Sequence, residues 1–210
     1  MTHNNINIEN KNLIDCEIEK YLDWVDKALV QFINNDNFLK ENFSERAKCF
    51  RIGHYLANTI EKQTLISDGI VVDCEYNRCE YESKKLGEDY NRALDEFEYR
   101  YNSSSLHVVP DIIVHKRGEK ENYIVIEAKN NCWYYKDKAK VKTFVECNDY
   151  LYKVGILLNF KQINSIDDCF YMFYIKQNGK VCWYSHKLKD NDDCKNKLQK
   201  NFYNNSEIMV

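Results

Sequence analysis

Two apolar runs joined by a short charged turn constrain the fold of this chain more than any other feature. The runs, 107–116 and 122–129, have the length of β-strands, and the turn between them, KRGEKE, combines one glycine with five charged residues. Each run is interrupted by an acid where an apolar side chain would pack better, Asp111 in the first and Glu127 in the second. The pattern predicts an antiparallel hairpin that carries carboxylates toward a core.

The remaining segments predict helices that pack against a sheet containing this hairpin. Apolar residues recur every three or four positions in 13–33 and 44–62, which is typical of amphipathic helices, and Ser44 stands where an N-cap is expected. The other expected elements are a half-buried strand in 69–78, a helix around 88–100, a helix in 134–152, a fully buried strand in 153–160, and a hairpin in 169–185 around Asn178–Gly179.

This order of elements predicts a mixed α/β protein in which helices are layered on a sheet. A chain of 210 residues without a long linker is expected to form a single domain, 1–210. Its expected parts are a disordered start (1–11), an N-terminal helical extension (12–43), a core (44–160), and a C-terminal hairpin and tail (161–210).

Composition restricts the class of protein. Hydrophobic residues make up 44% and charged residues 30%, an ordinary globular balance, while a net charge of -3 argues against bulk electrostatic binding to nucleic acid, so such a surface would be a local patch. None of the nine cysteines has CxxC spacing, no secretory signal opens the chain, and no apolar stretch approaches the ~20 residues needed to cross a bilayer. We therefore expect a cytoplasmic protein with reduced thiols and no membrane partner.

The two acids of the hairpin point to a metal site. Because side chains alternate along a strand, Glu127 and Lys129 share one face, and Asp111 meets them if the register brings the two faces together. Close carboxylates in a part-buried site need a proton or a cation between them, and Mg²⁺ prefers oxygen ligands. Lys129 would hold or deprotonate a water, its pKa lowered by burial and by the metal. This chemistry is metal-assisted attack of water on a phosphodiester. Alternatively, Asp111 only begins a strand, and Glu127 and Lys129 form a solvated strand end.

The segments VVPDIIVHKRG and NYIVIEAKN resemble the motif of the PD-(D/E)xK nuclease superfamily, which includes restriction endonucleases, repair nucleases and RecB-like exonucleases. Together with SERA at the start of a helix and VDCEYNR, they resemble more narrowly a family of small bacterial proteins of that superfamily. The resemblance covers about residues 44–160. It implies a restriction-endonuclease-like core of helix, three antiparallel-leading strands, helix and strand, here with an extra N-terminal helix and a C-terminal β-hairpin.

The resemblance also implies roles for individual residues. Asp111 and Glu127 match the metal-binding acids, the carbonyl of Ala128 would complete the coordination, and Lys129 matches the catalytic lysine. Glu45 matches the acid that many members place on the first core helix, where it supports a metal-bound water. Glu45 also falls on the apolar face of its helix, although an acid in the first turn would equally complement the helix dipole.

Four further residues are candidates for substrate binding. Glu75 and Arg78 would reach the phosphate backbone, or they form an ordinary ion pair on a solvated strand face. Lys136 and Lys138 belong to a run of alternating lysines that makes a positive patch for phosphates, or simply a solvated helix face. The aromatic residues 133–135 fit either stacking on unpaired bases or a role in the core or at its rim.

These observations lead to three functional hypotheses. The first is a Mg²⁺- or Mn²⁺-dependent nuclease, an endonuclease or exonuclease that cuts DNA rather than RNA; the resemblance suggests a setting in restriction or anti-phage defence. The second is a catalytically silent nuclease-fold module that binds nucleic acid or a protein partner. The third is a component that works as a homodimer or with a partner subunit, for which the helix in 13–33 is a candidate docking element.

Overall fold

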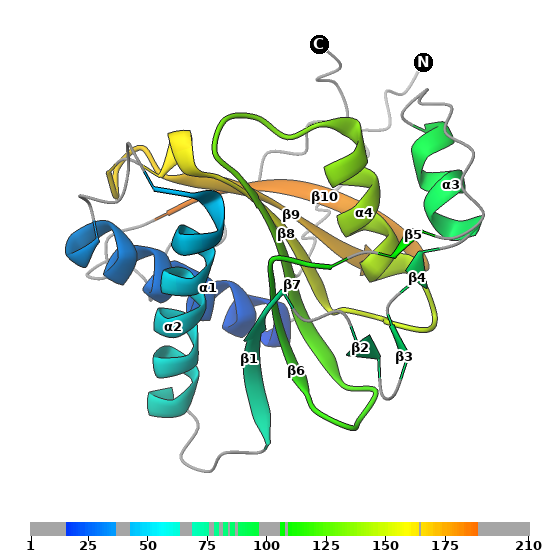
Figure 1. Cartoon of the computed structure of the whole chain (residues 1–210), viewed down its shortest axis with the longest axis horizontal. Coiled ribbons are helices and arrows are strands. Elements are labelled where there is room, and N and C mark those ends of the chain that lie inside the picture. Colours follow the sequence, from blue (N-terminus) through cyan, green and yellow to red (C-terminus); the bar gives the residue numbers. More distant parts are fainter. Residues whose placement is uncertain are drawn as a thin grey trace, which may run out of the picture.

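The protein is of the mixed α/β class, with four α-helices and a six-stranded, mostly antiparallel sheet among the residues that the structure describes (Figure 1). It is a computed structural model that describes residues 16–36, 43–63, 69–75, 78–79, 82–83, 85–86, 88–96, 106–107, 109–163 and 165–188. For Glu88, Glu96 and the two-residue segments of this list only the backbone is described. The expectations for residues 1–11 and for the C-terminal tail after Leu188 therefore lie outside the described residues.

The helices and the strands of the large sheet agree with the sequence predictions in type and order, and residues 97–100 of the helix expected around 88–100 lie outside the described residues. The helices are α1 (Cys16–Asn35), α2 (Glu45–Gln63), α3 (Glu88–Glu96) and α4 (Tyr135–Glu146). The strands of the large sheet, in their order across it, are β1 (Ile70–Cys74), β6 (Ile112–Lys116), β7 (Asn122–Lys129), β8 (Val154–Asn159), β9 (Phe170–Gln177) and β10 (Lys180–Lys187). Short pairs join β2 (Arg78–Cys79) to β3 (Glu82–Ser83) and β4 (Lys85–Leu86) to β5 (Leu106–His107).

Three predictions were too long. The strand expected in 107–116 begins only at Ile112, and the strand expected in 69–78 ends at Cys74, because the backbone of Glu75 is left-handed (φ 54). The helix expected in 134–152 ends at Glu146, and the chain then turns through Asn148 and Asp149, residue types whose short polar side chains favour turns over helix. The predicted turn between β9 and β10 is confirmed: Asn178 (φ 50) and Gly179 (φ 77) both adopt the left-handed conformation that a tight two-residue hairpin requires.

The register of the β6–β7 hairpin is the one that the candidate site needs. Ile112 pairs with Ile126 and Ile113 with Val125. This register places position 111, just before the first residue of β6, opposite position 127. β7 is parallel to β8, whereas the other neighbours in the sheet are antiparallel. A parallel pair needs a crossover connection, and α4 supplies it.

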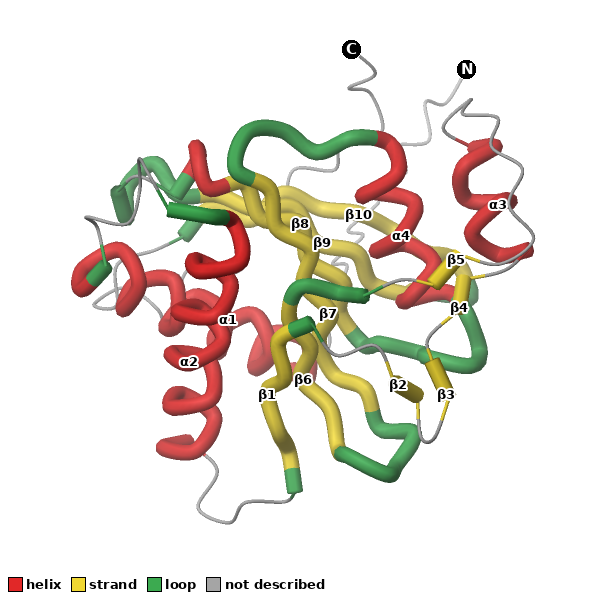
Figure 2. The backbone as a smooth tube through the Cα atoms, viewed as in Figure 1, coloured by secondary structure: helices red, strands yellow, loops and turns green. Residues whose placement is uncertain are grey.

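The helices cover the two faces of the sheet (Figure 2). α1 and α2 lie over one face and α3 and α4 over the other. Along β7 the side chains alternate between the two layers, so that Ile124 and Ile126 pack beneath α1 and α2 while Val125 packs beneath α4. The apolar face of α1 is used within the chain, because Trp24 and Leu29 are fully buried in the first of these layers.

Two glycines bring helices unusually close to the sheet. A Cβ on Gly155 of β8 would lie 2.5 Å from Cγ1 of Val141 on α4, and a Cβ on Gly53 of α2 would lie 2.6 Å from Sγ of Cys74 on β1. At both positions a side chain larger than that of glycine would force neighbouring atoms to shift. α2 and α4 are thereby held where their side chains reach the end of β7.

Two expectations from composition can be compared with the described residues. No helix among them combines the length and the apolar character that crossing a membrane requires. The seven cysteines whose side chains are described, at positions 16, 49, 74, 132, 147, 169 and 182, are all free thiols.

Candidate functional site

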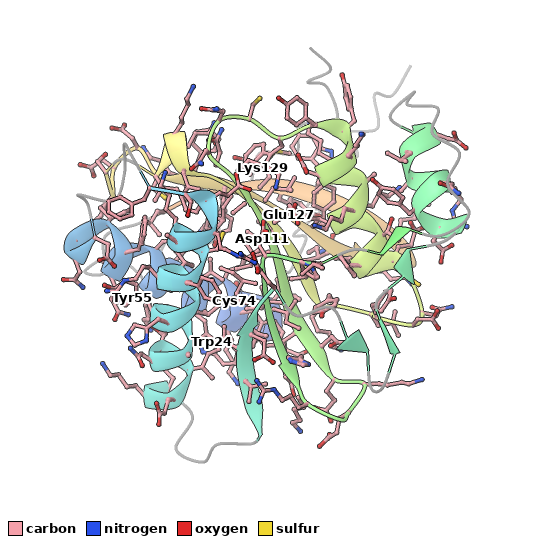
Figure 3. The ribbon with its side chains drawn as sticks, viewed as in Figure 1. Trp24, Tyr55, Cys74, Asp111, Glu127 and Lys129 are labelled. Atoms are coloured by element: carbon pink, nitrogen blue, oxygen red, sulfur yellow. The ribbon has the colours of Figure 1, made fainter. Side chains whose placement is uncertain are left out.

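The predicted acids and lysine of the hairpin lie together. Figure 3 shows Asp111, Glu127 and Lys129 grouped at one edge of the sheet, between the start of α2 and α4. Asp111 immediately precedes β6, whereas Glu127 and Lys129 lie in the last three residues of β7, so the antiparallel pairing brings them to the same end of the hairpin. The side chain of Glu127 is only 5% exposed and that of Asp111 only 22% exposed.

The ammonium group of Lys129 is the centre of this cluster. Its Nζ donates hydrogen bonds to Oε1 of Glu127 at 2.9 Å and to Oε1 of Glu45 at 3.3 Å. It also lies 3.9 Å from Oδ2 of Asp111 and 3.9 Å from Oδ1 of Asp137. Four carboxylates thus converge on a single cation. They come from α2, from β7, from α4 and from the residue that precedes β6.

Asp111 is held by the backbone of β7 and repelled by its neighbour. Its Oδ2 accepts a hydrogen bond from the N–H of Ala128 at 2.8 Å, while the carbonyl oxygen of Ala128 accepts one from Nζ of Lys129 at 3.0 Å. Burial and the charge of Glu127 raise the pKa of Asp111 to about 6, against the lowering effects of the Ala128 N–H and of the lysines. This carboxyl therefore sits in surroundings that favour a bound proton or an added cation.

The structure corrects the prediction for Lys129. The sequence argument expected a lowered pKa, and burial does act in that direction. The carboxylates of Glu127, Asp111 and Asp137 outweigh it, so the pKa of Lys129 is raised well above its usual value. The sequence argument counted burial and a bound metal ion but left out the charges of Glu127 and Asp111, which have the largest raising effects on the pKa of Lys129.

Glu45 reaches the cluster from α2. Its helix begins as predicted, since Oγ of Ser44 accepts the N–H of Ala47 at 3.2 Å. Oε2 of Glu45 accepts the N–H of Asn130 at 2.9 Å, and Oε1 accepts a proton of Lys129. Glu45 thus ties the first turn of α2 to the end of β7, in addition to any effect on the helix dipole.

Sequence reasoning missed two residues of α4 that belong to the cluster. Nζ of Lys140 contacts Oε2 of Glu127 and donates a hydrogen bond to the carbonyl oxygen of Val109 at 2.9 Å. Oδ2 of Asp137 accepts the N–H of Tyr134 at 2.7 Å, and burial raises the pKa of Asp137. A signal was present, because Asp137 and Lys140 are three residues apart and share the helix side of the buried residues Val141 and Phe144.

Other predicted residues lie outside the cluster. Glu75, whose backbone is left-handed (φ 54), forms a bidentate ion pair with Arg46 of α2, and this pair lowers the pKa of Glu75. The side chain of Glu75 is thus in an ion pair with α2, and its contact with a phosphate stays a prediction. For Arg78 only the backbone, in β2, is described.

The predicted lysines of α4 face outward. Lys136 is exposed, and Nζ of Lys138 lies 5.9 Å from the ring centroid of Tyr135, a residue that is itself 53% exposed. The lysine of this run that enters the cluster is Lys140. Of the neighbouring aromatic residues, Trp133 donates its indole N–H to the carbonyl oxygen of Leu158 at 2.7 Å and packs against the core.

The donor atoms of the cluster suit a hard divalent cation. They are the carboxylate oxygens of Asp111, Glu127 and Glu45 and the carbonyl oxygen of Ala128, and oxygen donors are those that Mg²⁺ and Mn²⁺ prefer. Among the described residues, no three His, Cys, Asp or Glu side chains are placed so that they could hold a metal ion. The two carboxylate oxygens of Glu127 meet the ammonium groups of Lys129 and Lys140, so an ion that bound Glu127 would displace one of them.

Comparisons with known proteins add no relative. No protein-family model matches the chain, and no match was found among the curated proteins. What the protein does is therefore inferred from the chemistry of the site.

Proposed function

We propose that the protein is a Mg²⁺- or Mn²⁺-dependent nuclease that hydrolyses phosphodiester bonds in DNA. One observation carries the proposal: the carboxylates of Glu45, Asp111, Glu127 and Asp137 converge on the ammonium of Lys129 at one edge of the sheet. With Lys140 included, four acids face two ammonium groups, and such an excess of negative charge in a part-buried site attracts a divalent cation.

The order of elements supports a restriction-endonuclease-like core. Between residues 44 and 160 the elements α2, β1, β6, β7, α4 and β8 follow one another in the order that the sequence resemblance implies, with α3 and the short strands β2 to β5 inserted between β1 and β6. In this arrangement Asp111 would stand before the second core strand, and Glu127 and Lys129 would end the third. The restriction or anti-phage setting and the preference for DNA over RNA are supported by the resemblance alone.

The residues of the cluster divide into ligands and hydrogen-bond donors. Asp111, Glu127 and the carbonyl of Ala128 would hold the ion, and Glu45 would hold a water beside it. When bound, the ion stabilises negative charge on the scissile phosphate and makes a water molecule more acidic. The ammonium group of Lys129 donates to Glu127, Glu45 and the Ala128 carbonyl, so Lys129 would act as a hydrogen-bond donor that orients water and phosphate oxygens.

A second candidate function is a binding module without turnover, and one observation favours it. Each oxygen of the Glu127 carboxylate is paired with a different ammonium group, Oε1 with Lys129 and Oε2 with Lys140. The buried acid at the centre of the cluster is therefore neutralised without any metal. On this alternative the cluster is a structural network, and the protein binds nucleic acid or a protein partner on its surface.

Cleavage assays test the first candidate. Full-length protein is incubated with supercoiled plasmid, linear duplex, single-stranded DNA and RNA, each with Mg²⁺, with Mn²⁺ or with chelator. We expect cleavage only with a divalent ion, and loss of at least about 100-fold in Lys129→Ala. Lys180→Ala, which removes an exposed lysine at the β9–β10 turn, is the matched control and should cut like wild type.

Calorimetry with Mn²⁺ separates the two candidates. Uptake of Mn²⁺ by the wild type that disappears in Glu127→Gln supports the nuclease. A wild-type protein that takes up no Mn²⁺ and cuts none of the four substrates contradicts the nuclease, and nucleic-acid binding by such a protein would support the module instead.

A further inference from the structure

Lys140 occupies a position that the roles above do not explain. It comes from the middle of α4, and its side chain is only 14% exposed. Its ammonium group contacts Oε2 of Glu127 and donates to the carbonyl oxygen of Val109. Val109 is a partly exposed residue two positions before Asp111, so Lys140 bridges the buried acid of β7 and the rim of the site beside β6.

The two lysines that share Glu127 are held very differently. Lys129 donates to Glu127, Glu45 and the Ala128 carbonyl, and two more carboxylates lie 3.9 Å away, so it stays surrounded by acceptors if one partner is lost. Lys140 donates to one carboxylate and one carbonyl oxygen, and the charges of Asp111 and Asp137 act on it only from farther away. A cation that takes Oε2 of Glu127 therefore releases Lys140 more readily than a cation that takes Oε1 releases Lys129.

We propose that Lys140 is an internal counter-ion of Glu127 that a divalent cation displaces, and that the released ammonium then binds a phosphate group of the nucleic-acid substrate. This inference rests on the proposed nuclease function and adds to it a coupling between binding of the metal and binding of the substrate. Lysine suits the role because its ammonium is a compact charge on a flexible four-carbon stem, able to move several ångströms while α4 stays in place. The Val109 carbonyl keeps that charge near the rim, where a phosphate bound close to Asp111 would arrive.

Such an exchange has two consequences of opposite sign. Lys140 competes with the metal for Glu127, so removing its charge strengthens binding of the metal in the absence of substrate. The same charge attracts phosphate once the metal is bound, so removing it weakens binding of the substrate in the presence of metal. A residue that only supported the fold of the site would weaken both.

The first measurement is calorimetric titration of Mn²⁺ alone into full-length wild type and Lys140→Met. We expect Lys140→Met to bind Mn²⁺ at least about fivefold more tightly, a coupling of ordinary size between two ligands of one site. Lys142→Met is the matched control, because Lys142 lies two residues further along α4 and pairs with Glu146 at 4.0 Å. It should bind Mn²⁺ like wild type.

The second measurement is fluorescence anisotropy of a labelled 20-nucleotide DNA, single-stranded and duplex. In Ca²⁺, an oxygen-seeking ion used to limit turnover, Lys140→Met should bind the DNA about fivefold more weakly than wild type does. In chelator the two proteins should bind alike, because Lys140 is then still held by Glu127 in the wild type. Lys140→Arg, which keeps the charge, should restore much of the binding in Ca²⁺.

The outcomes separate this inference from the function on which it rests. If the wild type binds Mn²⁺ and cuts DNA but Lys140→Met binds Mn²⁺ no more tightly, the displacement of Lys140 is wrong and the nuclease stands. If the wild type takes up no Mn²⁺, both fail. If Lys140→Met does not fold, Lys140→Gln is used in its place. It should likewise bind Mn²⁺ more tightly than wild type and bind DNA in Ca²⁺ more weakly.

Discussion

Two aspartates on one face of the sheet have opposite surroundings. Asp73 of β1 pairs in register with Ile113, and Asp111 lies two residues before Ile113, so both side chains project toward the α4 side. Burial raises the pKa of Asp73, but hydrogen bonds from Arg117 and from His115, at 2.9 Å, outweigh it, and the net effect is a lowered pKa. The pKa of Asp111 is raised to about 6.

The difference lies in what the folded chain places beside each acid. Asp73 meets a guanidinium and an imidazole, which satisfy both of its oxygens. Asp111 meets one backbone N–H and a second carboxylate, that of Glu127. An acid that the protein itself satisfies is a structural group, whereas a buried acid with another acid beside it is a candidate for binding an external proton or cation.

The largest expected contrast is in cleavage. Asp111→Asn should reduce metal-dependent DNA cleavage by at least about 100-fold, because it removes a charged ligand, and even residues behind metal ligands contribute about 10–100-fold. Asp73→Asn should stay within a few-fold of wild type. Plasmid cleavage in Mg²⁺ measures both, and equal losses in the two variants would erase the distinction drawn between these acids.

The next contrast is in stability, with opposite signs. In chelator at pH 7.5, Asp73→Asn should lower the free energy of unfolding by about 1–3 kcal/mol, since it weakens charge-assisted hydrogen bonds to the buried His115. Asp111→Asn should leave the stability unchanged or raise it, because an amide oxygen can still accept the Ala128 N–H while the repulsion by Glu127 disappears. Urea denaturation gives both values. Marked destabilisation by Asp111→Asn would mean that its charge supports the fold.

The same two variants should respond to pH in opposite directions. The folded protein binds the Asp111 proton up to about pH 6, while an ordinary Asp has a pKa of 3.8, so the wild type loses stability as the pH rises through this window. The advantage of Asp111→Asn should therefore be absent near pH 4 and complete above pH 6. Asp73 has a lowered pKa, so its contribution is present above the ordinary Asp value and is lost as the pH falls through its folded value. Thermal melts from pH 3.5 to 8 in chelator check both trends, and parallel curves would contradict them.

The smallest expected effect concerns the cations near each acid. Lys136 and Lys138 lie on the outer side of the helix that borders Asp111, whereas Arg117 is paired with Asp73. Lys136→Ala and Lys138→Ala should each weaken DNA binding only a few-fold and reduce the slope of log affinity against log salt by about 1. Arg117→Ala should leave that slope unchanged. If only Arg117→Ala lowered the slope of log affinity against log salt, the nucleic acid would bind near Arg117 and not near Lys136 and Lys138.

The local pattern of apolar and polar residues was sufficient to predict most helices and strands, and it placed Glu127 and Lys129 on one face of a strand. The apolar periodicity of 13–33 and 44–62 indicated α1 and α2, and the Asn178–Gly179 pair indicated the β9–β10 turn, because each depends on neighbouring residues only. The spacing of Asp137 and Lys140 placed them on the buried side of their helix but did not assign them to this cluster. Their place in the cluster depends on how closely α4 lies on β8 at Gly155, a contact between segments that local sequence pattern does not specify.

Charge effects were the least predictable part. Glu75 was assigned to the strand face, but its partner is Arg46, 29 residues away on α2. The direction of the pKa shift of Lys129 was wrong because the charges of Glu127 and Asp111, with a smaller effect of Asp137 from α4, outweigh burial. Electrostatic sums of this kind depend on distances in three dimensions, which periodicity along the chain does not contain.

The sequence by itself therefore determined that Glu127 and Lys129 share one side of a strand, since alternation is a local property of the backbone, whereas the register of the hairpin places Asp111 beside them. Only the tertiary structure decided that helices from both faces of the sheet add Glu45, Asp137 and Lys140 to them, and which ammonium each carboxylate meets. The physical reason is range: backbone alternation acts over two residues, whereas the packing and the electrostatic field that complete the cluster act between segments up to 85 positions apart in the chain.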